Sequence, residues 1–533
     1  YPTTMKGRIS LAISPSNPRA MYAMVEAAKE ADGTGGSGLY RSADAGGTWE
    51  KMNDVNVRPF YYSQVRVDPR DENRVYFSST PVNFSDDGGK TYGSTTNNVH
   101  VDHHGMWIDP NDPERIVVGN DGGAAISFDR GGNWVVLNHF AIGQLYDVSY
   151  NMDVPYRVCG GLQDNGTWCA PSRVPSGGIT THHWATIGGG DGFVSAQDQV
   201  DPDIAWSESQ GGNMGRVNTR TGERATLQKP DWNEVWRPYQ DTIVTLLDQG
   251  TAQDDPRILD LRLRASADSA RFDLRWNWNT PFFQSVHERT WFYAGGSMVT
   301  KSTERGDHLK PISPDLSYAD PEKVKVSTQT TGGITPDVTG AETYATVVAL
   351  EESPIHAGWI FAGTDDGRVW RTKDDGKSWE EFTDRLIGVP AGTYVTRIEA
   401  SSHSDRRFYV TFDNHRRGDF TPYVFATDDD GRTFRSIVAD LPTGGPDFVH
   451  VIKEDPRNEN LLFVGTDVGA YVSTDRGQRW QRFMTGLSTV PVHDLEVHPR
   501  DRELIAATHG RSIWIVDIAP LERHRTDAAV LEK

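Results

Sequence analysis

The feature that most constrains this chain is a short motif, SxDxGxxW, that recurs with a fixed internal spacing. In each copy the Ser or Thr and the Asp can accept hydrogen bonds from backbone N–H groups of a tight turn, Gly can take a positive φ, and the aromatic residue begins the next strand. The six well-formed copies are SADAGGTW (42–49), SDDGGKTY (85–92), SFDRGGNW (127–134), TKDDGKSW (372–379), TDDDGRTF (427–434) and STDRGQRW (473–480), and STERGDHL (302–309) is degenerate. The motif predicts hairpin tips held by six structural aspartates, Asp44, Asp87, Asp129, Asp374, Asp429 and Asp475.

The segments around the motif repeat as well. An apolar strand ends near Asp-Pro or Ser-Pro, a second strand rich in Val, Tyr and Phe ends in Gly, and a third strand, the motif and a fourth strand follow. Ten candidate first strands can be counted, from ISLAISP near the N-terminus to HDLEVHP near the C-terminus. A single four-stranded unit cannot bury both of its faces, so neighbouring units must stack, and stacking around a channel is the propeller solution. The sequence therefore predicts an all-β protein, a β-propeller of about ten four-stranded blades over residues 7–519.

Several segments depart from this rhythm. The last unit has no fourth strand after LIAATHG and SIWIVDI, and residues 1–6 are a short candidate to close the ring. The alternative arrangement is one seven-bladed propeller plus part of a second. Residues 229–270 are expected to form a partly helical insertion, residues 314–342 a long loop of the kind that carries function on a rigid scaffold, and residues 520–533 a C-terminal tail.

Composition and charge exclude some partners. The 52 Gly, 29 Pro and 16 Trp suit many short strands joined by tight turns. The net charge of -20 and the pI near 5.2 repel phosphate backbones, so nucleic acid is not an expected partner. No apolar run approaches the ~20 residues that cross a bilayer, so no membrane span is expected. The chain opens at Tyr1 without an initiator Met, which indicates either a removed signal peptide or a piece of a longer protein.

The two cysteines bear on the compartment. Cys159 and Cys169 flank the turn-like segment LQDNGT, so an antiparallel hairpin would place them opposite each other, within reach of a disulfide. The alternative is two unrelated buried thiols. A disulfide indicates an oxidising compartment and hence a secreted or periplasmic protein.

Longer stretches carry a family resemblance. The tandem motifs, together with HGMWIDP, GLQDNGTW, GTDDGRVWRTKDDGKSW and THGRSIWIVD, resemble the sortilin-like Asp-box (BNR) repeat propellers of bacteria, which are often labelled glycosyl hydrolases. The similarity covers nearly the whole chain. Sortilin-type domains imply a ten-bladed ring that binds peptides. A more distant similarity to xyloglucan-cleaving endoglucanases implies paired seven-bladed propellers, and bacterial relatives with further repeats upstream imply one full propeller plus part of another.

Candidate binding residues follow from the propeller geometry. The first strand of every blade lines the central channel, so residues at its entrance converge although they lie far apart in the sequence. The loops after the second strands add further side chains. The expected channel-mouth residues are His103, His104, Tyr146, Asp147, Asp191, Trp278, Tyr344, His450, His493 and Asp494 from the first strands, and Asp121, Asp164, Asn165, Asp365 and His509 from the loops.

Metal binding has one candidate cluster. His100, Asp102, His103 and His104 form the densest titratable group in the chain and offer metal ligands or acid–base groups. Their spacing matches no zinc signature, and adjacent histidines in a strand point to opposite sides. Hydrogen bonding at the channel rim is therefore the favoured interpretation. The DDG runs offer oxygen ligands for Ca²⁺, but no twelve-residue calcium loop is present, and no cofactor is expected.

Catalysis needs a more specific arrangement. Glycoside hydrolysis uses two carboxylates about 5 to 10 Å apart across a cleft. Asp164 and Asp191, both in Gly-flanked turns of adjacent blades, are the candidates, although capping of their turns is the favoured interpretation.

Three functions follow as hypotheses. The first is a secreted binding propeller that holds a peptide, a glycan or a partner protein in the channel mouth or along residues 229–270. The second is an extracellular glycoside hydrolase of the xyloglucanase type. The third is a structural subunit of a surface or periplasmic assembly. The sequence leaves the oligomeric state open.

Overall fold

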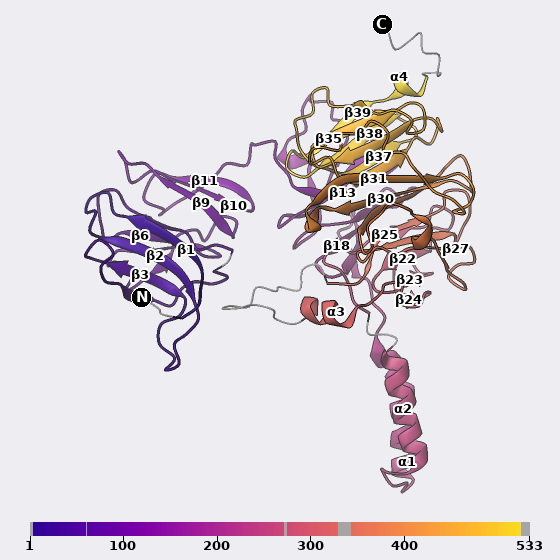
Figure 1. Ribbon diagram of the computed structural model, residues 1–533, viewed down its shortest axis with the longest axis horizontal. Helices are drawn as coiled ribbons and strands as arrows, with labels where there is room; N and C mark the ends of the chain where they lie inside the picture. The colour runs from indigo at the N-terminus through magenta and orange to yellow at the C-terminus, as the bar shows by residue number, and fades with distance from the viewer. Residues whose placement is uncertain (1–3, 60, 271–273, 329–342, 524–533) are drawn as a thin grey trace. The chain divides into compact units, whose positions relative to one another are not determined.

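The protein is built almost entirely of stacked antiparallel sheets. The computed structural model describes residues 4–59, 61–270, 274–328 and 343–523. These residues form ten sheets, nine with four strands and one with three, and in each sheet the strands are neighbours in sequence order. Figure 1 shows the sheets, which make the chain a multi-blade β-propeller protein and confirm the predicted fold class.

The chain divides into two compact units, and the first holds three sheets. The first unit comprises residues 1–142 and 326–339, and the second comprises residues 143–325 and 340–533. The strands of the first unit are β1 (Lys6–Ile13), β2 (Met21–Ala27), β3 (Gly38–Ser42), β4 (Glu50–Asn53), β5 (Val65–Val67), β6 (Val75–Ser78), β7 (Val82–Ser85), β8 (Gly93–Ser94), β9 (His103–Ile108), β10 (Ile116–Asn120), β11 (Gly123–Ser127) and β12 (Val135–Val136).

The second unit holds the other seven sheets. Its strands are β13 (Leu145–Tyr150), β14 (Arg157–Leu162), β15 (Gly166–Pro171), β16 (Ala185–Gly188), β17 (Ser195–Gln197), β18 (Ile204–Ser209), β19 (Asn213–Asn218), β20 (Arg224–Thr226), β21 (Phe282–Gln284), β22 (Phe292–Gly295), β23 (Val299–Ser302), β24 (Lys310–Pro311), β25 (Val347–Glu352), β26 (Ile360–Thr364), β27 (Val369–Thr372), β28 (Glu380–Glu381), β29 (Tyr394–Ala400), β30 (Phe408–Asn414), β31 (Asp419–Thr427), β32 (Arg435–Ser436), β33 (Val449–Glu454), β34 (Leu462–Thr466), β35 (Gly469–Ser473), β36 (Gln481–Arg482), β37 (Val492–His498), β38 (Glu503–Thr508) and β39 (Ile513–Asp517).

The seven sheets of the second unit close into a ring. Each first strand packs against the first strand of the next sheet, and β37 of the last sheet packs against β13 of the first. Leu145 and Val148 share a core with Ile505 and Ala507 of the last sheet. The backbone N–H of Val148 also donates to Asp494 Oδ2 at 3.1 Å.

The ten sheets therefore do not form a single ten-bladed ring. Because β13 is covered by the last sheet of the chain, the ring begins after residue 142, and the alternative of seven blades plus part of a second propeller is the observed one.

The last sheet keeps three strands among the described residues. The described part of the proposed closing segment, residues 4–6, does not supply a fourth, because Lys6 begins β1 and pairs with Ala27 of β2, and residues 1–3 lie outside the described part. In the expected tail, α4 (Ala519–Glu522) is followed by residues 524–533, which also lie outside it.

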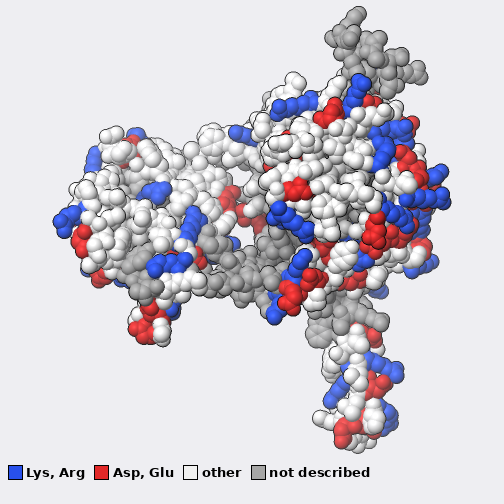
Figure 2. Space-filling model, in the orientation of Figure 1, with Lys and Arg blue, Asp and Glu red and all other residues white. Residues whose placement is uncertain are grey.

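Helices occur in the two segments that interrupt the sheets. Within residues 229–270, α1 (Trp232–Asp248) and α2 (Pro256–Ala270) pack against each other as a hairpin (Figure 1). Within residues 314–342, α3 (Pro321–Thr328) is followed by residues 329–342, which lie outside the described part. No described helix is long and apolar enough to span a membrane. Figure 2 shows acidic and basic side chains interspersed over this hairpin and over the visible face of the second unit.

The SxDxGxxW segments form turns with a common set of hydrogen bonds. In the first copy Ser42 Oγ accepts the N–H of Gly46 at 2.9 Å, Asp44 Oδ1 accepts the N–H of Thr48 at 2.8 Å, and Gly46 has φ +90°. The hydrogen bond from Thr48 lowers the pKa of Asp44 to about 2. Equivalent bonds hold the turns of Asp87, Asp129, Asp374, Asp429 and Asp475.

The cysteine prediction is confirmed. Cys159 of β14 and Cys169 of β15 lie directly opposite each other in the hairpin and form a disulfide, with Cα atoms 4.0 Å apart.

Candidate functional site

A shared irregularity of the first strands builds the site. In the described second unit, five first strands, β13, β25, β29, β33 and β37, carry a β-bulge at the same point. A bulge leaves one residue unpaired and redirects its side chain. The five bulge residues are Tyr146, Val348, Thr396, His450 and His493, and all of them line one cavity of about 610 Å³.

Glycine opposite the bulge lets the sheets approach closely. The residue after the bulge pairs with Gly161, Gly363 or Gly465 in three of these sheets. A Cβ atom at Gly161 would lie 2.1 Å from the carbonyl oxygen of Phe193, in the segment before the next first strand. The Gly that ends the second-strand pattern in the sequence is therefore required by the neighbouring sheet.

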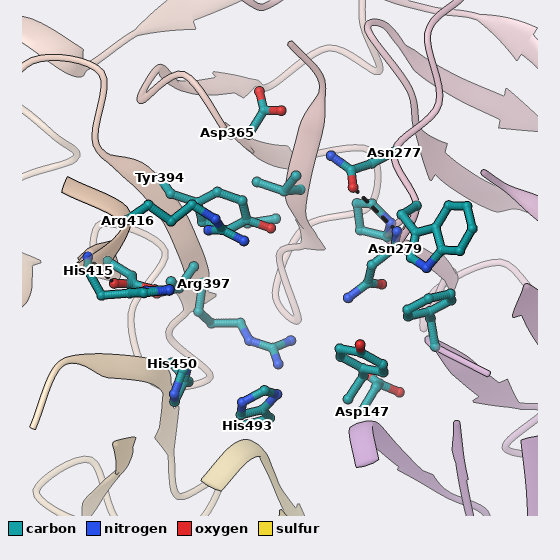
Figure 3. A pocket seen from close by; sticks show the side chains of 18 of the residues that line it. Asp147, Asn277, Asn279, Asp365, Tyr394, Arg397, His415, Arg416, His450 and His493 are labelled. Carbon is teal, nitrogen blue, oxygen red and sulfur yellow. Dashed lines mark hydrogen bonds and ion pairs between the residues drawn. The ribbon is translucent and has the colours of Figure 1, made fainter. Parts of the chain in front are cut away.

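The cavity has an aromatic side and a cationic side. Tyr146, Phe193 and Trp278 form a chain of ring contacts, with centroids 4.7 Å and 6.5 Å apart. Figure 3 shows Arg397, His415 and Arg416 facing Asn277 and Asn279 across the cavity. The lining also includes Lys323 and Arg417. The Arg416 guanidinium lies over the Tyr394 ring at 5.1 Å, and the Lys323 ammonium lies over Tyr344 at 5.6 Å.

Three histidine rings contact one another in a row at the base of the cationic side, and two of them, those of His493 and His509, are stacked. The ring centroids of His450 and His493 are 4.3 Å apart, and those of His493 and His509 are 4.1 Å apart. Burial, together with the two neighbouring rings, lowers the pKa of His493 well below its ordinary value, and burial also lowers the pKa of His509. His493 and His509 are therefore neutral at pH 7. His450 Nε2 lies 3.3 Å from Asp467 Oδ1.

Two carboxyl groups of the lining have raised pKa values. Burial, reinforced by the charge of Asp494, raises the pKa of Asp147 well above its ordinary value. Burial raises the pKa of Asp365 to about 7. The carboxylate of Asp413 lies 2.5 Å from His415 Nδ1. At neutral pH the cavity lining therefore carries less negative charge than the number of its aspartates implies.

Carboxyl groups on three first strands tie neighbouring sheets together, and one of them, that of Asp147, also lines the cavity. Asp147 accepts the N–H of Ser195 at 3.1 Å, Glu351 that of Ala400 at 3.3 Å, and Glu399 that of Glu454 at 3.1 Å. These contacts give the inward-facing acids of the channel a structural role.

The structure brings together many of the expected channel-mouth residues and separates others from them. The cavity is lined by Tyr146, Asp147, Trp278, Tyr344, Asp365, His450, His493 and His509. Asp494 is instead buried beneath the lining, paired with Arg397 and with the N–H of Val148.

The proposed carboxylate pair lies outside this lining. Asp191 is buried and accepts the N–H of Asp164 at 2.6 Å and an amide N–H of Gln210 at 2.8 Å. Asp191 thus holds the turn that contains Asp164 and Asn165, as the capping interpretation proposed.

The histidine cluster belongs to the first unit, whose sheets are not part of the seven-sheet ring. His104 is the bulge residue of β9, and its Nε2 lies 3.2 Å from Asp121 Oδ1; the corresponding distance between His450 and Asp467 is 3.3 Å. Burial lowers the pKa of His103 to about 4, and Asp102 accepts a hydrogen bond from Tyr62. His100 is half-buried, with Nδ1 3.2 Å from the Val101 carbonyl oxygen. Within the described ranges, no three His, Cys, Asp or Glu side chains are placed to hold one metal ion.

Sequence reasoning missed the cations and amides of the cavity. Arg397 follows a bulge, which shifts the period-2 alternation of β29 by one residue. His415, Arg416 and Arg417 form a short turn after β30, and the HRR run there was the available signal.

Comparisons with known proteins give only remote likenesses. No family model and no curated protein matches this chain. Among solved structures, a GH74 enzyme of Niastella koreensis is 11% identical, with 95% of this chain and 83% of that chain covered and a TM-score of 0.30. The GH74 xyloglucanase of Xanthomonas campestris is 14% identical, with 95% and 90% covered and a TM-score of 0.23. An extracellular domain described as part of a hybrid two-component system of B. thetaiotaomicron is 10% identical, with 97% and 59% covered and a TM-score of 0.44.

Proposed function

We propose that the second unit is a binding propeller that holds a peptide segment with an acidic group in its central cavity. The observation that carries this proposal is the convergence of five bulge residues on one cavity of about 610 Å³, a size typical of ligand pockets. Bulges are conspicuous next to functional sites because they redirect side chains at the cost of regular pairing.

The chemistry of the lining supports an acidic peptide. Phe193, Phe282 and Phe448 offer apolar contacts to a side chain, while Arg397 and Arg416 offer fork-shaped donors to a carboxylate. Because the pKa values of Asp147 and Asp365 are raised, these two carboxyl groups are ionised to a smaller extent than ordinary aspartates near neutral pH and oppose an anion less.

Paired peptides test the proposal. Fluorescently labelled peptides that contain one aromatic residue and either Asp/Glu or Asn/Gln at the same positions are titrated with the protein. Arg416→Gln should weaken binding of the acidic peptides about tenfold, as expected for loss of a charge-assisted contact. Arg432→Gln is the matched control, because Arg432 is exposed and lies outside the cavity lining. Equal binding of acidic and amide peptides, or equal affinity in both variants, would contradict the proposal.

A glycoside hydrolase is the second candidate, favoured by one observation. Asp147 and Asp365 line the same cavity as Trp278, and both have raised pKa values, as a general acid requires. Release of reducing sugar from xyloglucan or β-glucans, lost in Asp147→Asn or Asp365→Asn but retained in Asp164→Asn and Asp191→Asn, would establish this activity. Absence of release from every substrate counts against it.

Location and family belong to the same proposal. The Cys159–Cys169 disulfide supports an oxidising compartment, and we place the protein in the periplasm or outside the cell. The six turns of common geometry support membership of the sortilin-like Asp-box propellers. A role as a subunit of a surface assembly is compatible with peptide binding.

A further inference from the structure

A second hollow lies beside the hairpin that supplies His415 and Arg416 to the cavity. It has a volume of about 480 Å³ and lies between residues 418–421, where β31 begins, and residues 443–446, in the loop that leads into β33. We call it the Phe420 pocket. All eight of its lining residues belong to the second unit, and they are distinct from the residues that line the cavity.

An irregularity of the β30–β31 hairpin places Phe420. The ladder between these strands leaves residues 420–422 opposite the single residue Asp413. Extra residues on one strand bulge out of a ladder and redirect their side chains, and Pro422, which has no N–H to donate, suits such a bulge. Phe420 is 47% exposed as a result. The carboxylate of Asp413, on the other strand, holds His415 in the cavity wall.

An aromatic contact connects the pocket with the cavity. The ring centroids of Phe420 and Phe448 are 6.0 Å apart, and Phe448 is a buried residue of the cavity lining whose ring also stacks on His415 at 4.8 Å. Residues 415–417 line the cavity and residues 418–421 line the pocket. The two hollows therefore lie on consecutive stretches of one hairpin.

The pocket offers an apolar ring and main-chain groups rather than a charge. Asp419 is the one charged residue of its lining, and its carboxylate accepts hydrogen bonds from Asn414 Nδ2 at 3.0 Å and Tyr423 Oη at 2.7 Å. The N–H groups of residues 443–445 donate to no described residue. Exposed N–H groups of this kind bond to water or to a ligand. An apolar side chain together with its peptide groups therefore matches the pocket.

Gly444 contributes to the space in the pocket. A Cβ atom at this position would meet no described atom within 4 Å, and Gly444 is not among the glycines with a positive φ. Neither close packing nor backbone conformation thus requires glycine here. Because Gly444 lines the pocket, a larger residue at this position would occupy part of it.

We propose that the Phe420 pocket is a second subsite for the peptide that the cavity binds, and that it takes an apolar side chain of that peptide. This inference rests on the proposed function, because an acidic group held by Arg416 brings the flanking residues of the same peptide to this hairpin. The occupant is a continuation of that peptide, since the residues that line the two hollows follow one another in the sequence. Phe420 then determines which residue is preferred beside the acidic group.

Extended peptides test the proposal. The labelled acidic peptide is lengthened at its N-terminus or at its C-terminus by Gly-Leu-Gly or by Gly-Ser-Gly. At one of the two ends, the Leu extension should bind about tenfold more tightly than the Ser extension, as expected for burial of a leucine side chain. In Phe420→Ser the two extensions should bind equally. Phe128→Ser, at a 59% exposed phenylalanine of the first unit, is the matched control and should keep the tenfold difference.

Gly444→Phe gives a second readout, because it fills the pocket without removing Phe420. The preference for the Leu extension should be lost in this variant too, and circular dichroism checks that both variants retain the fold. Equal affinities of the Leu and Ser extensions at both ends in the parent, or a preference that persists in Phe420→Ser, would overturn the proposal while leaving acidic-peptide binding intact. Failure of the unextended acidic peptide to bind would instead overturn the proposed function, and this inference with it.

Discussion

Gly161→Ala should destabilise the ring, whereas Gly119→Ala should not. The two glycines occupy equivalent positions in their sheets, and neither has a positive φ. At Gly161 the added Cβ would lie 2.1 Å from the oxygen and 2.3 Å from the nitrogen of Phe193, and backbone atoms cannot move aside without separating the sheets. Forcing an extra carbon into such a contact costs about 1 to 3 kcal/mol or more. At Gly119 the methyl group meets no described atom, so reduced flexibility of the unfolded chain should stabilise by about 0.4 to 1 kcal/mol.

Chemical denaturation followed by tryptophan fluorescence measures this difference. The expected midpoint of Gly161→Ala is clearly lower than that of the parent, and the midpoint of Gly119→Ala is equal or slightly higher. Equal losses in the two variants would refute the claim that close approach of the next sheet requires glycine at this position.

Three further predictions concern the second unit. The pKa of Asp365 is raised from 3.8 to about 7, so ionisation of its carboxyl group destabilises the folded protein as the pH rises between these values. The free energy of unfolding of Asp365→Asn should therefore equal that of the parent at pH 4. At pH 8 it should be higher than that of the parent by at most about 4 kcal/mol, as chemical denaturation can measure. Replacing Cys159 and Cys169 by Ala opens a loop with a sequence separation of 10 and should cost up to about 3 kcal/mol in the same assay without reductant, and added reductant should then have no further effect. Asp494→Asn removes the buried carboxylate that pairs with the half-buried Arg397 and should cost about 3 kcal/mol at pH 7, whereas a loss below 1 kcal/mol would contradict the pairing.

Local features of the fold were accessible from the sequence. The SxDxGxxW spacing marks hairpin tips because its hydrogen bonds lie within one turn, as at Ser42 and Asp44. The disulfide followed from the position of Cys159 and Cys169 around one hairpin turn. Tyr146 and His493 were placed at the channel because first strands line it in any propeller.

The sequence alone could not show where the ring closes. The blades on both sides of residue 142 carry the same repeat, and closure depends on the fit between β13 and β37, which are more than 300 residues apart. The sequence pattern did not reveal the bulges either. One inserted residue reverses the alternation of side chains along β29 and turns Arg397 toward the channel region. Asp191 and Asp365 both follow the pattern of Gly-flanked acids in turns, and only the three-dimensional structure separates the turn cap from the cavity residue.

The central claim is that residues 143–518 close on themselves as seven sheets around the cavity. Gln144 and His509 lie directly opposite each other in an isolated antiparallel bridge between the first and last sheets of this ring, 365 residues apart in the sequence. The double variant Gln144→Cys/His509→Cys, oxidised and digested without reduction, should yield a peptide pair linked through these two positions, identified by mass spectrometry. Free thiols at both positions, with the Cys159–Cys169 linkage intact, would contradict the seven-sheet ring.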